Sequence, residues 1–368
     1  SDPLNPAIAN GGNAWVQDAT KLNSPRDIAI SGNYAYVTAF ASNALTVIDI
    51  SDPLNPAIAN GGNAWVQDAT KLGGAHSISI SGNYAYITAS SNNSLTVIDI
   101  SDPLNPAVAN GGNALIQDNT KLNSPSDIKI SGNYAYIASR LSNALTVIDI
   151  SDPLNPAIAN GGNAWVQDAT KLSDTQGLFV VGNYVYVTAE NNNSMAVIDI
   201  ADPLNPAIAN SGNALIQDNT RLDDPNAIFV VGRYAFVTAS SGNSMAVIDI
   251  ADPLNPAIAN SGNAWVQDAT KLNAATDISV VDNYAYITAS GNNSMTIIDL
   301  GCNPTNPGQI LTGTDIGFNP QQPNCIEGND GPFQLIDFDT GEQPLDLYKF
   351  GNYAVSYTHL RAHETCTN

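Results

Sequence analysis

The sequence contains few of the side chains on which most enzymes depend. Of the 368 residues, three are cysteine and three are histidine. Residues 1–300 contain no cysteine, one histidine (His76) and one glutamate (Glu190). This scarcity excludes most pairings of a nucleophile with a general base. We therefore expect a protein that is not an enzyme, with no catalytic residues and no cofactor.

Basic residues and long apolar runs are also scarce. Twelve lysines and arginines face 34 aspartates and glutamates, which gives a formal net charge of -22. Nucleic-acid binding needs a basic surface, so no nucleic-acid partner is expected. No apolar run approaches the roughly 18 residues that would cross a bilayer, so membrane insertion is not expected either. Hydrophobic residues nevertheless make up 43% of the chain, enough for a substantial core.

Six copies of a 50-residue unit occupy residues 1–300, a period at the upper end of the range for propeller blades. In the first copy, alternation and β-branched or aromatic residues predict strands at 28–30, 34–39 and 45–50. Two prolines make 51–56 a turn, and 57–60 follows as a short outer strand. The stretch 63–70 is either a further strand or a single helical turn.

The strand sequence LTVIDI is apolar on both faces, so both faces of each sheet must be covered. Four short antiparallel strands per unit, stacked on their neighbours, satisfy this requirement. We therefore predict an all-β chain, a β-propeller of six four-stranded blades that stands alone or is part of a larger propeller. A β-solenoid is the alternative, although its repeats are usually shorter.

Two motifs that recur in all six units resemble a known family. LTVIDISDPLNP and GNYAYVTA are similar to the strands and turn of LVIVD-type repeats. The resemblance covers residues 1–300 and implies a bacterial or archaeal propeller that is secreted or lies at the cell surface. The units here are longer than the usual repeat, and the extra residues are expected within GGNAWVQDAT.

The ends of the chain lead to separate expectations. The sequence starts within a repeat, so we expect the true N-terminus to be missing. Residues 6–16 are placed to complete the sixth blade, whereas residues 301–354 are interpreted as a divergent segment and a partial seventh repeat. Residues 355–368 resemble a translated sequencing adapter. Cys302 and Cys325 are expected to form a disulfide if the protein is exported.

Sequence variation among the six copies concentrates in two stretches, residues 23–27 and 40–42 of the unit. Antiparallel topology places both at the same end of each sheet, while the nearly invariant SGN and SDPLNP turns lie at the other end. Loops on a rigid scaffold commonly carry binding functions. We therefore predict a monomeric binding domain of a larger protein that recognises a protein or a glycan. The alternatives are a structural spacer and a hydrolase or lyase whose site lies in missing sequence.

The candidate ligand-binding residues belong to these variable stretches: Arg26, His76, Arg140, Gln176, Glu190, Asp224 and Asn226. Basic residues fall in copies one to three and acidic residues in copies four and five, which suggests an electrically polarised face. Asp27, Asp127 and Asp277 begin equivalent strands and are weak candidates for a cation site. Trp15, Trp65, Trp165 and Trp265 are expected to pack rather than to stack on sugars, because two copies carry leucine instead.

Overall fold

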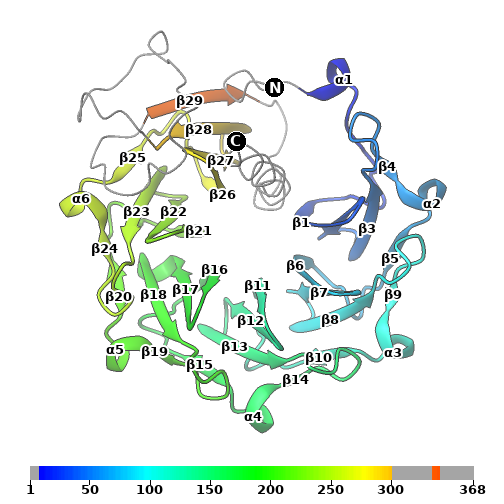
Figure 1. The fold of residues 1–368 in the computed structure, drawn as a ribbon, viewed down its shortest axis with the longest axis horizontal. Coiled ribbons are helices and arrows are strands. Elements are labelled where there is room, and N and C mark those ends of the chain that lie inside the picture. Colours follow the sequence, from blue (N-terminus) through cyan, green and yellow to red (C-terminus); the bar gives the residue numbers. More distant parts are fainter. Residues whose placement is uncertain (1–7, 301–333, 340–368) are drawn as a thin grey trace, which may run out of the picture. The chain divides into compact units, whose positions relative to one another are not determined.

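The computed structural model describes residues 8–300 and 334–339, which form six small antiparallel sheets (Figure 1). In the first sheet, β1 (Pro25–Ser31), β2 (Tyr34–Ala39) and β3 (Ala44–Asp49) form a meander. Two short strands, β4 (Ala57–Ile58) and β5 (Trp65–Gln67), both pair with β3 and together serve as its fourth strand. The prediction of a six-bladed β-propeller with four-stranded blades is confirmed.

The later repeats have the same order of elements. The second contributes β6 (Ala75–Ser81), β7 (Tyr84–Ala89), β8 (Ser94–Asp99), β9 (Ala107–Val108) and β10 (Leu115–Gln117). The third contributes β11 (Pro125–Ser131), β12 (Tyr134–Ser139), β13 (Ala144–Asp149), β14 (Ala157–Ile158) and β15 (Trp165–Gln167). The fourth contributes β16 (Thr175–Val181), β17 (Tyr184–Ala189), the 3₁₀ turn η1 (Glu190–Asn192), β18 (Ser194–Asp199), β19 (Ala207–Ile208) and β20 (Leu215–Gln217). The fifth contributes β21 (Pro225–Val231), β22 (Tyr234–Ala239), β23 (Ser244–Asp249), β24 (Ala257–Ile258) and β25 (Trp265–Gln267).

The sixth sheet has the order β26 (Ala275–Val281), β27 (Tyr284–Ala289), β28 (Ser294–Asp299) and β29 (Gln334–Asp339). Its fourth strand therefore comes from the segment that the sequence marks as divergent. The remainder of 301–354, the terminal residues 355–368 and the cysteine pair Cys302 and Cys325 lie outside the described residues.

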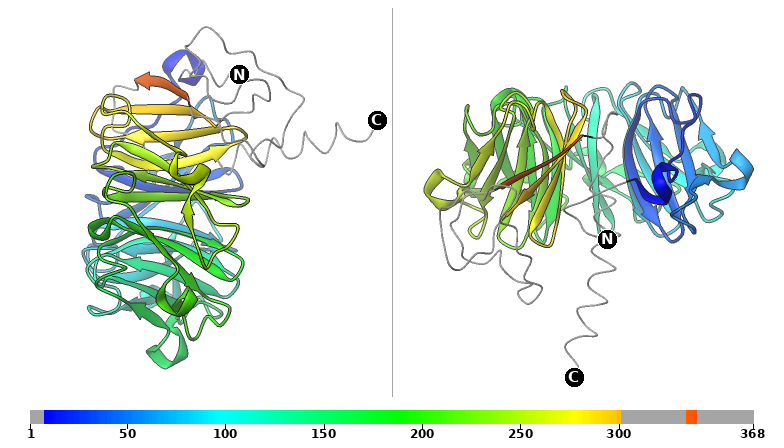
Figure 2. Two further views of the ribbon diagram at one scale, coloured as in Figure 1. Left: turned by 90° about the vertical axis from the view of Figure 1, so that its left-hand side faces the viewer. Right: turned by 90° about the horizontal axis from the view of Figure 1, so that it is seen from above.

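The chain divides into two compact units, one comprising Ser1–Asn192 with Ala196–Gly212 and the other Asn193–Met195 with Asn213–Asn368. In the first unit, β6 lies between β1 and β11, and β11 lies beside β16. In the second, β21 lies beside β26. Figure 2 shows that the strands of the first unit run across its thickness, so their turns gather at two ends.

Apolar side chains between successive sheets form the core. Leu45 and Val47 of the first sheet belong to one buried cluster with Ile78 and Ile87 of the second. All four are at most 5% exposed. Stacking the sheets therefore covers both faces of the apolar strands, as the LTVIDI sequence requires.

A helical turn interrupts the fourth strand in each of the first five sheets, and an equivalent turn precedes β1. In the second repeat this turn is α2 (Ala59–Gly62), and its counterparts are α1 (Ala9–Gly12), α3 (Ala109–Gly112), α4 (Ala159–Gly162), α5 (Ala209–Gly212) and α6 (Ala259–Gly262). Asn60 and Gly61 have left-handed φ angles of 53° and 58°. The side-chain amide of Asn60 donates a hydrogen bond to the carbonyl oxygen of Leu104 in the next repeat at 3.0 Å. The expected outer strand at 57–60 is therefore shorter than predicted, and the ambiguous stretch 63–70 contains a strand.

Within the described ranges, no helix is long and apolar enough to cross a membrane.

Candidate functional site

The two variable stretches of each repeat lie next to each other. The backbone N–H of Phe40 donates to the carbonyl of Ser24 at 2.9 Å, and that of Glu190 donates to Asp174 at the same distance. At the other end of the sheet, the N–H of Ile50 donates to Asn33 in the SGN turn at 2.9 Å. The prediction that the variable stretches share one end of the sheet is confirmed. We call residues 23–26 and 40–42 of each repeat the variable loops.

The backbone of the variable loops keeps one conformation although the side chains differ. Position 24 of the repeat has a left-handed φ in every copy, from 53° at Ser124 to 64° at Gly74. An asparagine of the preceding repeat holds this position in place. The Oδ1 of Asn43 accepts the N–H of Gly74 at 2.9 Å, and the Oδ1 of Asn143 accepts that of Asp174 at 2.9 Å. The scaffold therefore presents different side chains on one backbone geometry.

Position 26 of the repeat, near the start of each innermost strand, carries a different polar residue in every copy. The six residues are Arg26, His76, Ser126, Gln176, Asn226 and Thr276. Four of the predicted ligand-binding residues therefore occupy one structural position. The left-handed φ at position 24 is kept in every copy, so the diversity at position 26 changes side-chain chemistry beside a shared loop geometry.

Between the first and second sheets, Arg26 and His76 both approach the ring of Phe40. The guanidinium of the exposed Arg26 lies 5.0 Å from the ring centroid. The imidazole of His76 meets the same ring edge-on, with 6.4 Å between centroids. These contacts join a cation, an aromatic ring and an imidazole from two consecutive repeats.

The tautomer of His76 follows from its hydrogen bond. Nδ1 lies 2.7 Å from the carbonyl oxygen of Ser126, which can only accept, so Nδ1 carries the hydrogen. Burial and the nearby charge of Arg26 lower the pKa of His76, while the Ser126 carbonyl and the carboxylates of Asp27 and Asp127 oppose this shift. The neutral ring therefore keeps a lone pair on Nε2.

Arg140 of the third repeat binds two carboxylates of the fourth. Its Nε and Nη2 donate to the two carboxylate oxygens of Asp174 at 2.6 and 3.0 Å. Glu190 lies 3.5 Å from Nη2, and Gln176 donates to both Glu190 and Asp174. The hydrogen bond to Asp174 raises the pKa of Arg140 above its usual value. Asp174 and Glu190 thus neutralise the charge of Arg140 locally. The hypothesis of an electrically polarised face, with basic and acidic residues on separate sides, therefore applies only to the other charged residues of the variable loops.

The other predicted residues lie in the second unit. Asp224 has a left-handed φ of 56°, and its N–H donates to Asn193 Oδ1 at 3.0 Å. Its carboxylate accepts a hydrogen bond from Ser241, a residue of the neighbouring variable loop. Asn226 is half-buried at position 26 of the fifth repeat.

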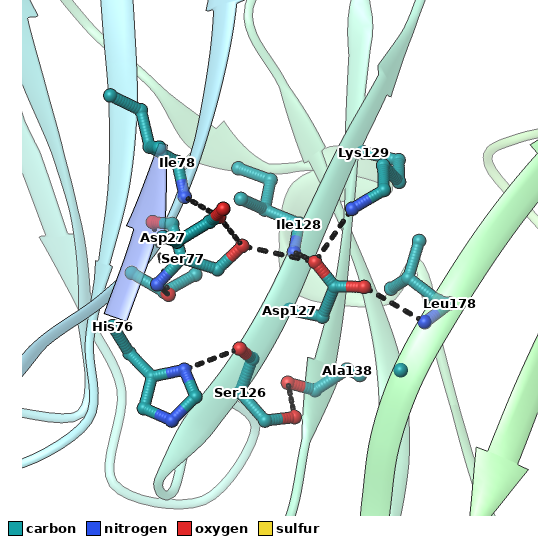
Figure 3. A network of polar contacts seen from close by, with 12 residues as sticks. Asp27, His76, Ser77, Ile78, Ser126, Asp127, Ile128, Lys129, Ala138 and Leu178 are labelled. Carbon is teal, nitrogen blue, oxygen red and sulfur yellow. Dashed lines mark hydrogen bonds and ion pairs between the residues drawn. The ribbon is translucent and has the colours of Figure 1, made fainter. Parts of the chain in front are cut away.

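The proposed cation ligands Asp27 and Asp127 belong to the polar network drawn in Figure 3. Ser77 Oγ lies 2.7 Å from Asp27 and 3.0 Å from Asp127. Lys129 donates to Asp127 at 2.8 Å. Asp277 lies in the second unit. Among the described residues, no three His, Cys, Asp or Glu side chains are grouped so that they could hold a metal ion.

The comparison with family models agrees with this repeat structure. The LVIVD repeat model matches residues 24–60, 72–110, 124–160, 173–213, 224–263 and 274–313. The chain belongs to the LVIVD repeat family. Each of the first five matches runs from the variable loop of one repeat through its meander into the DPLNP turn and the strand that follows. No curated protein matches this LVIVD chain.

Solved structures with a similar fold are distant in sequence. A protein of unknown function from Desulfotomaculum acetoxidans shares 14% identity over 77% of this chain and 87% of that one, with a TM-score of 0.58. A putative 6-phosphogluconolactonase from Bacteroides fragilis shares 11% over 76% and 80%, with a TM-score of 0.60. Virginiamycin B lyase from Staphylococcus aureus shares 13% over 76% and 82%, with a TM-score of 0.56. These similarities show the fold alone.

The sequence did not indicate the roles of Phe40 and Ser77 in the first LVIVD repeats. Phe40 contacts Arg26 and His76, and Ser77 lies between the carboxylates of Asp27 and Asp127. A signal for Phe40 was present, because position 40 is polar or charged in the other five copies.

The tryptophans were expected to pack, and three of them lie beneath a cation from the preceding repeat. Lys21 and Lys121 lie 5.8 Å from the rings of Trp65 and Trp165. Arg221 lies 5.6 Å from Trp265.

Proposed function

We propose that this LVIVD propeller is a non-catalytic recognition module, secreted or displayed at the cell surface, that binds a protein or glycan through its variable loops. The observation that carries the proposal is position 26, where six different polar residues stand beside a backbone that is the same in every repeat. Random sequence drift would be expected to change the supporting residue of the loop as well. Instead, the asparagine at position 43, which supports the loop, is present in all six copies. Rigid presentation of varied side chains lowers the entropic cost of binding.

The scarcity of nucleophiles and general bases in the repeats supports a role without catalysis. The putative lactonase and the lyase are too distant for their chemistry to be transferred to this chain. A spacer without a ligand of its own is the competing function, and the same experiment separates the two.

The test is a glycan-array and cell-surface binding screen with the full chain and a variant in which Arg26, His76, Gln176 and Asn226 are all serine. Serine already occupies this position at Ser126, so the variant is expected to fold. The control is Arg233→Asn, which restores the residue that the other five repeats carry in the SGN turn. Binding that the quadruple variant loses and the control keeps supports recognition. Absence of binding by the folded wild-type protein supports the spacer.

A further inference from the structure

Among the described residues, Arg26 differs from the other arginines of the repeats in forming no ion pair with a carboxylate. Arg140 pairs with Asp174, Arg221 with Asp218 and Arg233 with Asp249. Within residues 8–300, Arg26 forms no ion pair, and its guanidinium lies over the ring of Phe40. In a chain with a formal charge of -22, an exposed guanidinium without a carboxylate beside it is an exception.

The sequence of the second repeat makes room for Phe40. A Cβ added to Gly74 would lie 3.1 Å from Phe40 Cε2, 2.9 Å from Ser90 Oγ and 2.5 Å from Ser91 Oγ. The other repeats carry Ser, Asp or Ala at this position, and the Cβ of each of these residues would press against the Phe40 ring. Phe40 and Gly74 therefore fit each other, and the ring acts as a platform that restrains Arg26 beside His76.

The two polar groups at this platform have complementary chemistry. The guanidinium offers two parallel N–H donors, which match a carboxylate. The Nε2 of His76 offers an acceptor, because its hydrogen is on Nδ1. A ligand that uses both groups needs a carboxylate and, close to it, a hydroxyl or N–H donor.

The net charge favours one class of such ligands. An acidic protein would be repelled by the charge of -22 as a whole, whereas an isolated carboxylate on an otherwise neutral body would be repelled less. A uronic acid has this form, with hydroxyl groups next to its carboxylate. We propose that Arg26 and His76, positioned by Phe40, form a subsite for a single uronic acid residue of an otherwise neutral glycan. This inference rests on the proposed recognition function and names its ligand class.

Calorimetric titration of the full chain with galacturonic acid, which carries one carboxylate, and with its methyl ester tests the subsite. The ester keeps the hydroxyl groups and removes the negative charge. We expect the acid to bind at least about tenfold more tightly than the ester. Arg26→Ser should reduce the affinity for the acid by about tenfold or more, and His76→Ser by a smaller factor. Phe40→Ser, which copies Ser90, should weaken binding although Arg26 remains.

Two controls protect this test from trivial explanations. Arg233→Asn removes an arginine from the opposite end of the sheet and should leave the affinity unchanged. Arg221→Lys, which copies the lysine that the other five repeats carry at position 21, changes an arginine outside the variable loops and should also leave the affinity unchanged. Equal binding of acid and ester, unchanged affinity in Arg26→Ser, or no binding of the acid by folded wild-type protein would each overturn the subsite. Preference for an acidic peptide over the sugar acid would also overturn it.

The two proposals fail in different ways. If the binding screen finds a ligand that requires Gln176 or Asn226 but not Arg26, recognition by the variable loops stands and the acidic-sugar subsite does not. If neither the screen nor the titration detects binding, both proposals fail.

Discussion

The carboxylate of Asp27 accepts the backbone N–H of Ile78 at 2.7 Å and so connects the first sheet to the second. Asp127 makes the equivalent contact with Leu178 at 2.9 Å, which connects the third sheet to the fourth. Ser77 Oγ lies between the two carboxylates (Figure 3). The buried backbone donors of Ile78 and Leu178 are satisfied by these contacts. Asp27 and Asp127 therefore join successive sheets, a structural role that the sequence alone did not distinguish from cation binding.

Asp127→Ala should lower the free energy of unfolding by about 1–3 kcal/mol, because the N–H of buried Leu178 loses its acceptor. Alanine is compatible with the backbone at this position, since Ala227 occupies it in the fifth repeat. Urea denaturation measures the change. Lys129→Ala, which copies Ala29, is the matched control. It removes the ion pair but keeps the contact between sheets, and should cost less than Asp127→Ala. Equal costs would show that the ion pair, and not the backbone contact, stabilises this region.

Asn143→Gly should loosen the variable loop of the fourth repeat without straining its own backbone. Asn143 has a left-handed φ of 51°, which glycine adopts freely, but glycine cannot supply the Oδ1 that accepts the Asp174 N–H. We expect a loss of about 1 kcal/mol and faster hydrogen exchange at the Asp174 amide. Asn143→Asp keeps an acceptor oxygen and should leave exchange close to that of the wild type. Unchanged exchange in the glycine variant would contradict the support that we assign to this asparagine.

The fold could be predicted from the sequence because its signals are local and repeated six times. The strand Tyr34–Ala39 follows from aromatic and β-branched residues, and the adjacency of the variable stretches follows from antiparallel topology. The left-handed turn at Asn60 and Gly61 was not predicted, because a Gly-Gly pair permits several conformations. The roles of Asp27 and Phe40 were not predicted either. Asp27 contacts Ser77 and Ile78, and Phe40 contacts His76, and these contacts between repeats exist only once successive sheets are stacked.

Alkaline pH should destabilise the protein through its buried tyrosines. Burial raises the pKa of Tyr136 to about 12, and the same holds for Tyr36, Tyr86, Tyr186 and Tyr286. The unfolded chain releases these protons at its ordinary pKa of about 10. The folded pKa is raised, so the stabilisation is complete below pH of about 10 and is lost as the pH rises towards about 12. Urea midpoints measured across this interval should therefore fall. Tyr136→Phe, which copies Phe236, should reduce the slope, and an unchanged slope would contradict the assignment.

Trp165→Leu should affect stability modestly and glycan binding not at all. The ring of Trp165 is half-buried, with Lys121 at 5.8 Å from its centroid, and Leu115 and Leu215 occupy the same position in other repeats. The substitution removes the cation–π contact and part of the buried surface, so we expect a loss of about 1–2 kcal/mol in urea denaturation. Binding is measured with the glycan array and with the galacturonic acid titration. A large fall in affinity without a change in folding would show that the tryptophan stacks on a sugar. It would move the recognition site from the variable loops to the fourth strand of the blade.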